Sequence, residues 1–309
     1  MNLTDKIFHD DEAARLHLEA QRWPDGAYCP HCGECEKVTL LGGKSTKPGT
    51  YICKSCRTKF TVTVGTVFER SHVGLAKWLL AFRLMASSKK GVSAHQLHRS
   101  LDVTYKTAWF MAHRIRAAMA EENPGPLGGE GKTVEVDETY MGGKEANKHR
   151  NKRMAKRDHL GGKQAVVTLV ERDGKARSFH VANVTSKTLR PIVVKHASRK
   201  SNLMTDGARM YPKMGAEFAS HGSVDHVRGE YVRGPIHSNT VENFFSILKR
   251  GVYGTYHHVS EAHLARYLAE FDYRYNSRLD TDSIRTDAML KATTGKRLTY
   301  RRSGESANA

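Results

Sequence analysis

The sequence predicts an α/β protein in which a mixed β-sheet flanked by helices follows a small metal-binding ribbon and a short helical module. Three observations support this prediction. Two Cys-x-x-Cys pairs lie between residues 29 and 56, helical periodicity fills residues 75–119, and strand patterns dominate after residue 132. The Pro- and Gly-rich segment 123–131 is typical of a linker and separates the helices from the strands.

Composition limits the class of partner more than it limits the fold. The 309 residues contain 50 Lys and Arg against 32 Asp and Glu, a net charge of +18. Such a charge favours a polyanion, with nucleic acid as the first candidate, although a merely basic surface is the alternative. No run approaches the roughly 18 apolar residues of a membrane helix, and the first six residues lack the apolar core of a signal peptide. Five cysteines in this pattern indicate a reducing cytoplasm.

The N-terminal part is expected to hold a helix and then a zinc ribbon. The helix covers residues 5–23 of a segment 1–24, and the ribbon covers residues 25–68. Four thiolates in two Cys-x-x-Cys turns can close a tetrahedral zinc site. Cys32 and Cys35 also form a Cys-x-x-Cys pair, but Gly33 suits the tight turn that follows the pair Cys29 and Cys32, so that pair is preferred. The alternative to zinc binding is a redox or disulfide role for these cysteines. The expected ligands of one structural Zn²⁺ are Cys29, Cys32, Cys53 and Cys56.

Residues 72–122 are predicted to form a helix-turn-helix domain. Helices are expected at 75–87, at 93–100 after a Ser93 cap, and from a Thr104 cap onward. Small and aliphatic residues at helical spacing give the last helix one buried face. Its opposite, basic side suits the major groove of DNA, while a helical hairpin with a solvated basic face is the alternative. The expected DNA-contacting residues are Tyr105, Lys106, Trp109, His113, Arg114 and Arg116.

The largest domain is predicted at residues 132–294, after the linker. Three strands with a hairpin, a helix, a fourth strand and then mostly helices match an RNase H-like sheet. The basic run 144–157 is expected to be a loop that contacts phosphates or a solvated insertion, and residues 295–309 a disordered tail. Strands are predicted at 133–140, 165–170, 176–184, 201–206 and, weakly, 230–233; helices at 189–197, 210–218, 239–251 and 260–276.

Three carboxylates in this domain are candidates for a catalytic metal site. Asp137 and Asp206 each end a short apolar run, and Glu242 lies near the start of the helix 239–251. Strand alternation places Asp137 on the face opposite the flanking valines, which makes Glu138 the weaker candidate. Two Mg²⁺ ions about 3.5–4 Å apart, held by a few carboxylates, can drive phosphodiester chemistry.

The helix that carries Glu242 has a second polar group of interest. Apolar residues at 241, 244, 245 and 248 give the helix one buried face. On a different face, Lys249 follows Glu242 by two turns, about 10 Å, where a cation could hold a DNA phosphate. Read alone, this pattern favours an ordinary exposed helix face; the two aspartates and the basic chain favour a functional one.

Three motifs resemble the bacterial insertion-sequence transposases of the DDE superfamily, and most closely the group with an N-terminal zinc ribbon. They are Val134–Thr139 (Val-Glu-Val-Asp-Glu-Thr), Thr205–Gly207 (Thr-Asp-Gly) and His237–Gly251 (His-Ser-Asn-Thr-Val-Glu-Asn-Phe-Phe-Ser-Ile-Leu-Lys-Arg-Gly). The 36-residue interval from Asp206 to Glu242 and the segments Tyr256–Val259 and Phe271–Arg278 add to the resemblance.

The resemblance implies an RNase H-like core with two Mg²⁺ (or Mn²⁺) ions. Asp137, Asp206 and Glu242 would be the metal ligands, and Lys249 and Arg250 would contact DNA. The expected function is a transposase that binds terminal inverted repeats, cleaves strands at element ends and joins them to target DNA. It would act in the cytoplasm as a homo-oligomer. The alternatives are a zinc-ribbon and helix-turn-helix transcription regulator, an RNase H-like endonuclease without strand transfer, or an inactive domesticated copy.

Overall fold

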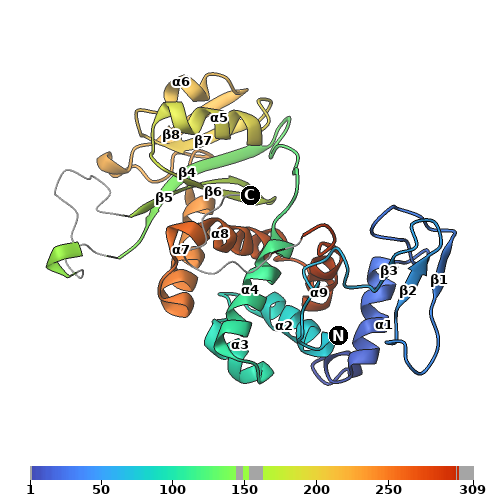
Figure 1. Ribbon diagram of the computed structural model, residues 1–309. Helices are drawn as coiled ribbons and strands as arrows, with labels where there is room; N and C mark the ends of the chain where they lie inside the picture. Colours follow the sequence, from blue (N-terminus) through green and yellow to red (C-terminus); the bar gives the residue numbers. More distant parts are fainter. Residues whose placement is uncertain (1, 144–148, 153–162, 297, 299–309) are drawn as a thin grey trace. The chain divides into compact units, whose positions relative to one another are not determined.

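A computed structural model describes residues 2–143, 149–152, 163–296 and 298 (Figure 1). The chain divides into two compact units, which we describe separately. The N-terminal unit comprises Met1–Met119 together with Asp280–Ala309, and the sheet unit comprises Ala120–Leu279.

The N-terminal unit begins with a helix that packs on a small antiparallel ribbon. Asp10 caps the helix by accepting hydrogen bonds from the backbone N–H groups of Glu12 and Ala13. The ribbon is a three-stranded antiparallel sheet with the order β1-β2-β3. These elements are η1 (Lys6–Phe8), α1 (Asp11–Arg22), β1 (Val38–Leu40), β2 (Tyr51–Cys53) and β3 (Lys59–Phe60).

The ribbon obtains its hydrophobic core by packing against the end of α1. The Trp23 ring makes edge contacts with Tyr51 and Phe60, with ring centroids 5.3 and 6.0 Å apart. Arg22 Nη1 donates hydrogen bonds to the carbonyl oxygens of Val62 and Val64, at 2.5 and 2.8 Å. A ribbon of such short strands has little core of its own, so α1 and the ribbon form one packing unit.

Three helices follow the ribbon, and the second and third begin with the predicted caps. They are α2 (Leu75–Ser87), α3 (Ala94–Leu101) and α4 (Tyr105–Met119). The Ser93 hydroxyl accepts from the Gln96 N–H at 3.1 Å, and the Thr104 hydroxyl accepts from the Thr107 N–H at 3.2 Å. Asp102 ends α3 in the left-handed conformation, with φ of 49°. A tight turn therefore joins α3 to α4.

Helix α9 (Asp282–Lys291) packs in the N-terminal unit, although its residues were predicted to belong to the domain at 132–294. Its Asp282 approaches Arg83 of α2 at 3.6 Å, and its Asp287 approaches His17 of α1 at 3.3 Å. The sequence did not predict this helix, because its few apolar residues, such as the fully buried Met289, make no clear stripe.

The sheet unit contains a five-stranded mixed sheet, which confirms the predicted fold class. The order is β6-β5-β4-β7-β8, with β4 parallel to β7 and β7 parallel to β8; the other pairs are antiparallel. The strands are β4 (Thr133–Met141), β5 (Gln164–Glu171), β6 (Ala176–Val181), β7 (Asn202–Asp206) and β8 (Ser220–Val224).

The predicted strand at 230–233 is wrong, because the fifth strand is β8 instead. Residues 230–233 lie in a loop closed by paired backbone hydrogen bonds between Arg233 and Ile236. The sequence of β8, Ser-His-Gly-Ser-Val, has one aliphatic residue, so periodicity could not reveal it. As an edge strand, β8 is specified by its backbone pairing with β7.

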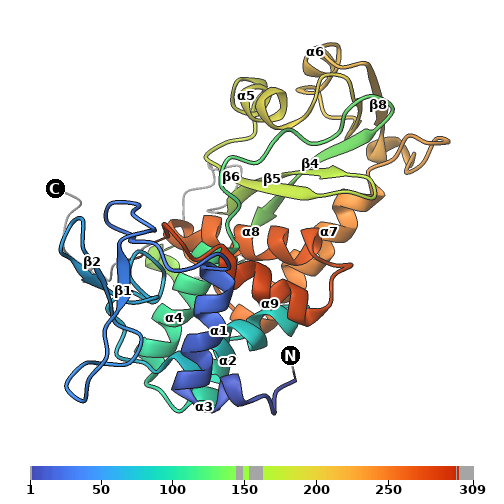
Figure 2. The same cartoon turned by 90° about the vertical axis from the view of Figure 1, so that its right-hand side faces the viewer.

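Helices cover both faces of this sheet (Figure 2). On one face, Val134 and Val136 pack with Leu189 and the helices α5 (Ser186–His196) and α6 (Pro212–Gly215). On the other face, Met141 and Val166 of the sheet pack with α7, the π-helical turn η5 and α8. These are α7 (Asn239–Gly251), η5 (Val252–Tyr256) and α8 (Glu261–Asn276).

Two predicted segments fall largely outside the described residues. In the basic run 144–157, only 149–152 are described, with a 3-10 turn at Arg150–Lys152. In the tail predicted to be disordered, residues 297 and 299–309 lie outside the described residues. The Gly295 N–H donates to the Gly65 carbonyl at 2.8 Å, so hydrogen-bonded structure extends into the start of that segment.

Because α9 packs in the N-terminal unit, a cavity created in that helix should lower the stability of this unit. Met289→Ala should destabilise this unit by about 2–5 kcal/mol, because the side chain is fully buried. The matched control Ile284→Ala, at a residue 54% exposed on the same helix, should change stability by less than about 0.5 kcal/mol. Urea unfolding followed by tryptophan fluorescence measures this, because Trp23, Trp78 and Trp109 all lie in the N-terminal unit. Equal midpoints for the two variants would contradict the assignment.

Candidate functional site

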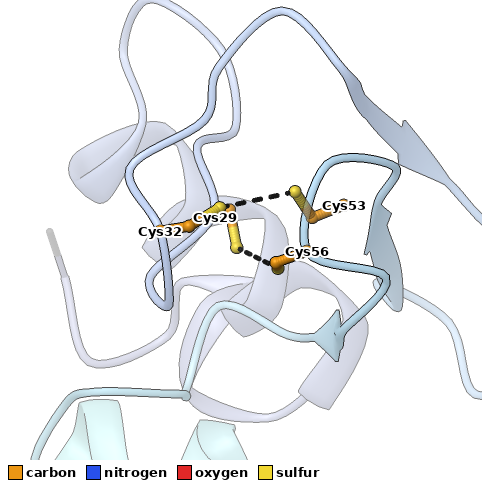
Figure 3. A group of neighbouring side chains, drawn as sticks. All are labelled: Cys29, Cys32, Cys53 and Cys56. Atoms are coloured by element: carbon orange, nitrogen blue, oxygen red, sulfur yellow. Dashed lines mark hydrogen bonds between the residues drawn. The ribbon is translucent and has the colours of Figure 1, made fainter.

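The four predicted zinc ligands converge at one point of the ribbon (Figure 3). Cys29 Sγ lies 3.6 Å from Cys56 Sγ, and Cys32 Sγ lies 3.6 Å from Cys53 Sγ. Four sulfurs around a tetrahedral Zn²⁺, each at a Zn–S distance of about 2.3 Å, are roughly 3.8 Å apart. The cluster therefore fits a structural zinc ion, and Cys35 is not part of it, which confirms the preferred pairing.

The two aspartates of the sheet unit lie at neighbouring positions of paired strands. Val136 pairs with Thr205 in the parallel register of β4 and β7, so Asp137 and Asp206 are the next residues on each strand. The Asp137 carboxylate accepts a hydrogen bond from the Glu138 N–H at 2.7 Å, and Asp206 accepts from the Ala208 N–H at 3.1 Å. The sheet thus brings the two acids together, as the sequence predicted.

Glu242 reaches this region from the first turns of α7. The Ser238 hydroxyl donates a hydrogen bond to Glu242 Oε1 at 2.9 Å, and His226 Nε2 lies 3.6 Å from the same oxygen. Sequence analysis did not identify Ser238 or His226 as members of the site. The serine precedes α7 and resembles an ordinary cap residue, and the histidine lies in a loop without periodicity.

The three acids share one electrostatic environment. Burial, together with the negative charges of Glu138, Asp206 and Glu242, raises the pKa of Asp137 to about 7, although the hydrogen bond from the Glu138 N–H opposes the shift. Burial also raises the pKa of Asp206, although the Ala208 N–H and the nearby His226 oppose that shift. A divalent cation between these groups would favour their ionised forms, so the all-oxygen donor set fits a hard cation such as Mg²⁺.

The acids are gathered but not closed into a tight cluster. In the described part of the chain, the four cysteines are the only group of three or more His, Cys, Asp or Glu side chains whose ligand atoms all lie within 4.8 Å of one another.

Glu138 lies on the opposite face of β4 from Asp137, as strand alternation predicted. The Tyr211 hydroxyl donates a hydrogen bond of 2.6 Å to Glu138 Oε2, and Tyr211 is fully buried among the residues beneath that face. Burial raises the pKa of Glu138, and this hydrogen bond opposes the shift. The glutamate therefore contributes charge to the site from the far side of the strand.

The structure corrects the expected DNA-contacting face of α4. Tyr105 is 45% exposed and Lys106 is also exposed, whereas His113, Arg114 and Arg116 are buried, at 0, 7 and 2%. Arg114 Nη1 donates to the carbonyl oxygens of Val67 and Glu69, at 2.6 and 3.0 Å. One buried face was predicted for α4, but α2, α3 and α9 all pack against this helix, and residues before α2 accept hydrogen bonds from Arg114. Trp109, one turn after the exposed Tyr105 and Lys106, is half-buried.

The two cations near the end of α7 lie on the helix that carries Glu242. Lys249 is half-buried and seven residues beyond Glu242, which corresponds to about 10 Å along the helix axis. Arg250 is exposed, and its Nη2 donates a 2.5 Å hydrogen bond to the Ser246 hydroxyl.

Comparisons with known proteins agree with this organisation. Residues 126–276 match the ISXO2-like transposase domain, and residues 9–59 match the transposase zinc-ribbon domain. A protein of Halobacterium salinarum, described as an uncharacterized protein in the transposable element ISH50, is 30% identical over 279 residues. That alignment covers 87% of this chain and 92% of the relative. Among the helices of the described residues, none is long and apolar enough to span a membrane.

The raised pKa of Asp137 predicts how pH affects stability without a divalent cation at the acids. Its folded-state pKa of about 7 exceeds the ordinary value of 3.8, so the folded protein binds the proton more tightly. Stability should therefore fall as pH rises from 4 towards 8. Asp137→Asn removes the ionised carboxylate and should raise the melting temperature at pH 8, with a gain that shrinks towards pH 4. The control Asp173→Asn, at an exposed turn residue, should show no such pH dependence. Thermal melts in buffer free of Mg²⁺ and Mn²⁺ measure both; a gain independent of pH would contradict the prediction.

Proposed function

The chain belongs to the ISXO2-like family of transposases with an N-terminal zinc ribbon, and from this premise we propose that it cleaves DNA at the ends of an insertion sequence and joins those ends to target DNA. The observation that carries this proposal is the placement of Asp137, Asp206 and Glu242 in one electrostatic environment. Two of these acids come from paired strands and one from a helix, so a single fold supplies all three.

We propose that these acids hold two Mg²⁺ or Mn²⁺ ions. Their oxygen ligands suit hard cations. Burial is the main cause of the raised pKa values of Asp137 and Asp206, and a bound cation would favour the ionised form of both carboxylates. When bound, such ions activate the attacking oxygen and stabilise the charge that develops on the phosphate. The Ser238 hydroxyl orients the Glu242 carboxylate for this role.

The remaining groups of the site would position DNA. Lys249 and Arg250 would contact phosphates along α7, and the scissile phosphodiester would lie at the acids. In the first step, a water oxygen forms a bond to phosphorus and the 3′-oxygen leaves as a 3′-hydroxyl. In the second, that hydroxyl attacks a phosphodiester of target DNA, and the displaced 3′-oxygen of the target strand leaves. Each step exchanges one P–O bond for another.

We propose that the N-terminal unit recognises the inverted repeats at the element ends. The turn between α3 and α4 presents Tyr105 and Lys106, with Trp109 beside them, to DNA. Joining two ends requires two active sites, so the protein would act as a homo-oligomer in the cytoplasm, where the host DNA lies.

A nicking assay tests the catalytic assignment. Glu242→Gln should slow Mg²⁺-dependent nicking of an end-containing duplex by at least about a hundredfold, because even the outer partners of a metal site are worth ten- to a hundredfold. The control Glu261→Gln changes a glutamate that accepts a hydrogen bond from Gln164 and should leave the rate unchanged. Equal rates for Glu242→Gln and wild type would disprove the role of Glu242.

The same assay separates the proposal from its rivals. A pre-cut end with a free 3′-hydroxyl should be joined to target DNA by the wild type; nicking without joining would favour an endonuclease. A protein that binds DNA without any metal-dependent nicking would favour a transcription regulator or an inactive copy.

A binding assay tests the DNA-contacting face of α4. Lys106→Ala should weaken binding to end-containing DNA and reduce the slope of log K against log salt by about one, because it removes one phosphate contact. The control Lys6→Ala removes an exposed lysine that pairs with Asp10 at 3.2 Å and should leave the slope unchanged. Fluorescence anisotropy over a range of salt concentrations measures both; identical slopes in the two variants would remove α4 from the interface.

A further inference from the structure

We infer that Glu135 is a positioning residue that holds the start of α7 against β4 and thereby sets the place of Glu242 relative to Asp137. Its catalytic consequence rests on the function proposed above. Glu135 is fully buried although it carries a carboxylate, and it lies two residues before Asp137 on the same face of β4. Side chains of this type are rarely buried without a paired, specific role.

The Glu135 carboxylate binds the first turn of α7 directly. Its Oε2 accepts hydrogen bonds from the backbone N–H groups of Thr240 and Val241, at 2.8 and 3.0 Å. Its Oε1 accepts one from the Thr240 hydroxyl at 2.9 Å. The N-terminal N–H groups of a helix have no partner within the helix and carry partial positive charge, so a carboxylate is a favourable partner.

Glu135 takes the place of the usual cap because the cap residue is used elsewhere. Ser238 occupies the N-cap position of α7, but its side chain makes no capping hydrogen bond. Its hydroxyl instead donates to Glu242 Oε1. The N–H groups that a capping serine would bind are those of the second and third helical residues, and these are the two that Glu135 binds.

Arg172 and the loop before α7 complete the contact. Arg172 Nε donates to Glu135 Oε1 at 2.6 Å, and its two terminal nitrogens donate to the carbonyl oxygens of Pro235 and His237, at 2.8 and 2.9 Å. His237 Nδ1 lies 3.3 Å from the same carboxylate. The buried charge is thus paired and hydrogen-bonded, and the arginine joins the end of β5 to the chain that enters α7.

This contact relates two acids that come from different elements. Glu135 and Asp137 are separated by one residue on β4, about 7 Å, and Thr240 and Glu242 are separated by one residue on α7. The hydrogen bonds between Thr240 and Glu135 therefore fix the position of Glu242 relative to Asp137. A shift of α7 by one residue would move Glu242 by about 1.5 Å along the helix, enough to disturb a cation held by both acids.

A pair of identical substitutions tests the inference. Glu135→Gln keeps the side-chain shape but removes the charge that binds Arg172 and the start of α7. Glu270→Gln is the matched control, because Glu270 is also fully buried in the same unit, pairs with Arg274 and accepts a 2.6 Å hydrogen bond from the Tyr256 hydroxyl. Both variants should melt below wild type.

Only Glu135→Gln should alter the site. With the zinc ribbon saturated with Zn²⁺, titration of Mn²⁺ followed by electron paramagnetic resonance should show about tenfold weaker binding, and single-turnover nicking should slow by about ten- to a hundredfold. Affinity for end-containing DNA should stay at the wild-type level. Glu270→Gln should keep the wild-type Mn²⁺ affinity and nicking rate. Thr240→Val, a milder variant that removes one hydrogen bond to Glu135, should weaken Mn²⁺ binding by a few-fold.

Two results would overturn the inference: wild-type Mn²⁺ affinity in both Glu135→Gln and Thr240→Val, or an equal loss of Mn²⁺ affinity in Glu135→Gln and Glu270→Gln. Failure of the proposed function would be distinguishable. If the wild type binds Mn²⁺, and loses it in Glu242→Gln, but does not nick DNA, then the proposed reaction fails while the Mn²⁺ titrations still decide the role of Glu135.

Discussion

The contact between the Glu135 carboxylate and the first turn of α7 is the constraint on which the arrangement of the acids depends. Backbone pairing between β4 and β7 places Asp137 beside Asp206 without help from side chains. A helix has no such pairing with a sheet. The apolar face of α7, which includes Phe244 and Leu248, fixes which side of the helix meets the sheet, but such packing is weakly directional along the axis. Hydrogen bonds to the helix start supply the missing direction.

The acids of the site lower the stability of the folded protein, and packing in the rest of the sheet unit must offset this loss. Burial, with smaller contributions from the neighbouring acids, raises the pKa of Asp137, which means that its ionised form is disfavoured in the folded protein at neutral pH. The apolar residues of the strands that carry the two aspartates, such as Val134, Val136 and Leu203, are fully buried. Functional sites commonly break local rules in this way while the surrounding core keeps the fold stable.

Sequence patterns predicted the elements whose periodicity is strong, and they failed where long-range contacts decide. The bounds of α2 and α7 were predicted to the residue, because apolar spacing and local caps specify them. Strand β8 and helix α9 have few apolar residues and form through partners that are distant in the sequence. Burial of Arg114 likewise depends on the carbonyl groups of Val67 and Glu69, which a helical wheel of α4 cannot show.

Glu135 illustrates why the sequence predicted the three acids of the site but not the residues that support them. Glu135 stands between two valines, and such alternation is typical of a strand with one solvated face, so the pattern gives no sign that this carboxylate is buried. Ser238 precedes the predicted helix, where a serine is an ordinary cap, so the pattern does not show its hydrogen bond to Glu242 either. The two roles are linked. Glu135 of β4 caps α7, so the Ser238 hydroxyl is able to bind Glu242 instead.

The zinc cluster of the ribbon and the proposed cation site at the acids differ in the chemistry of their ligands. Four sulfurs suit Zn²⁺, and those of the ribbon lie within 4.8 Å of one another. Asp137, Asp206 and Glu242 come from two strands and a helix, and their carboxylates are more widely spaced, so each acid needs its own support. A closed site suits a structural ion, whereas an open one leaves room for a phosphate and a nucleophile. An open site needs residues such as Glu135 and Ser238 that hold each metal-binding acid in place, because the acids do not orient one another.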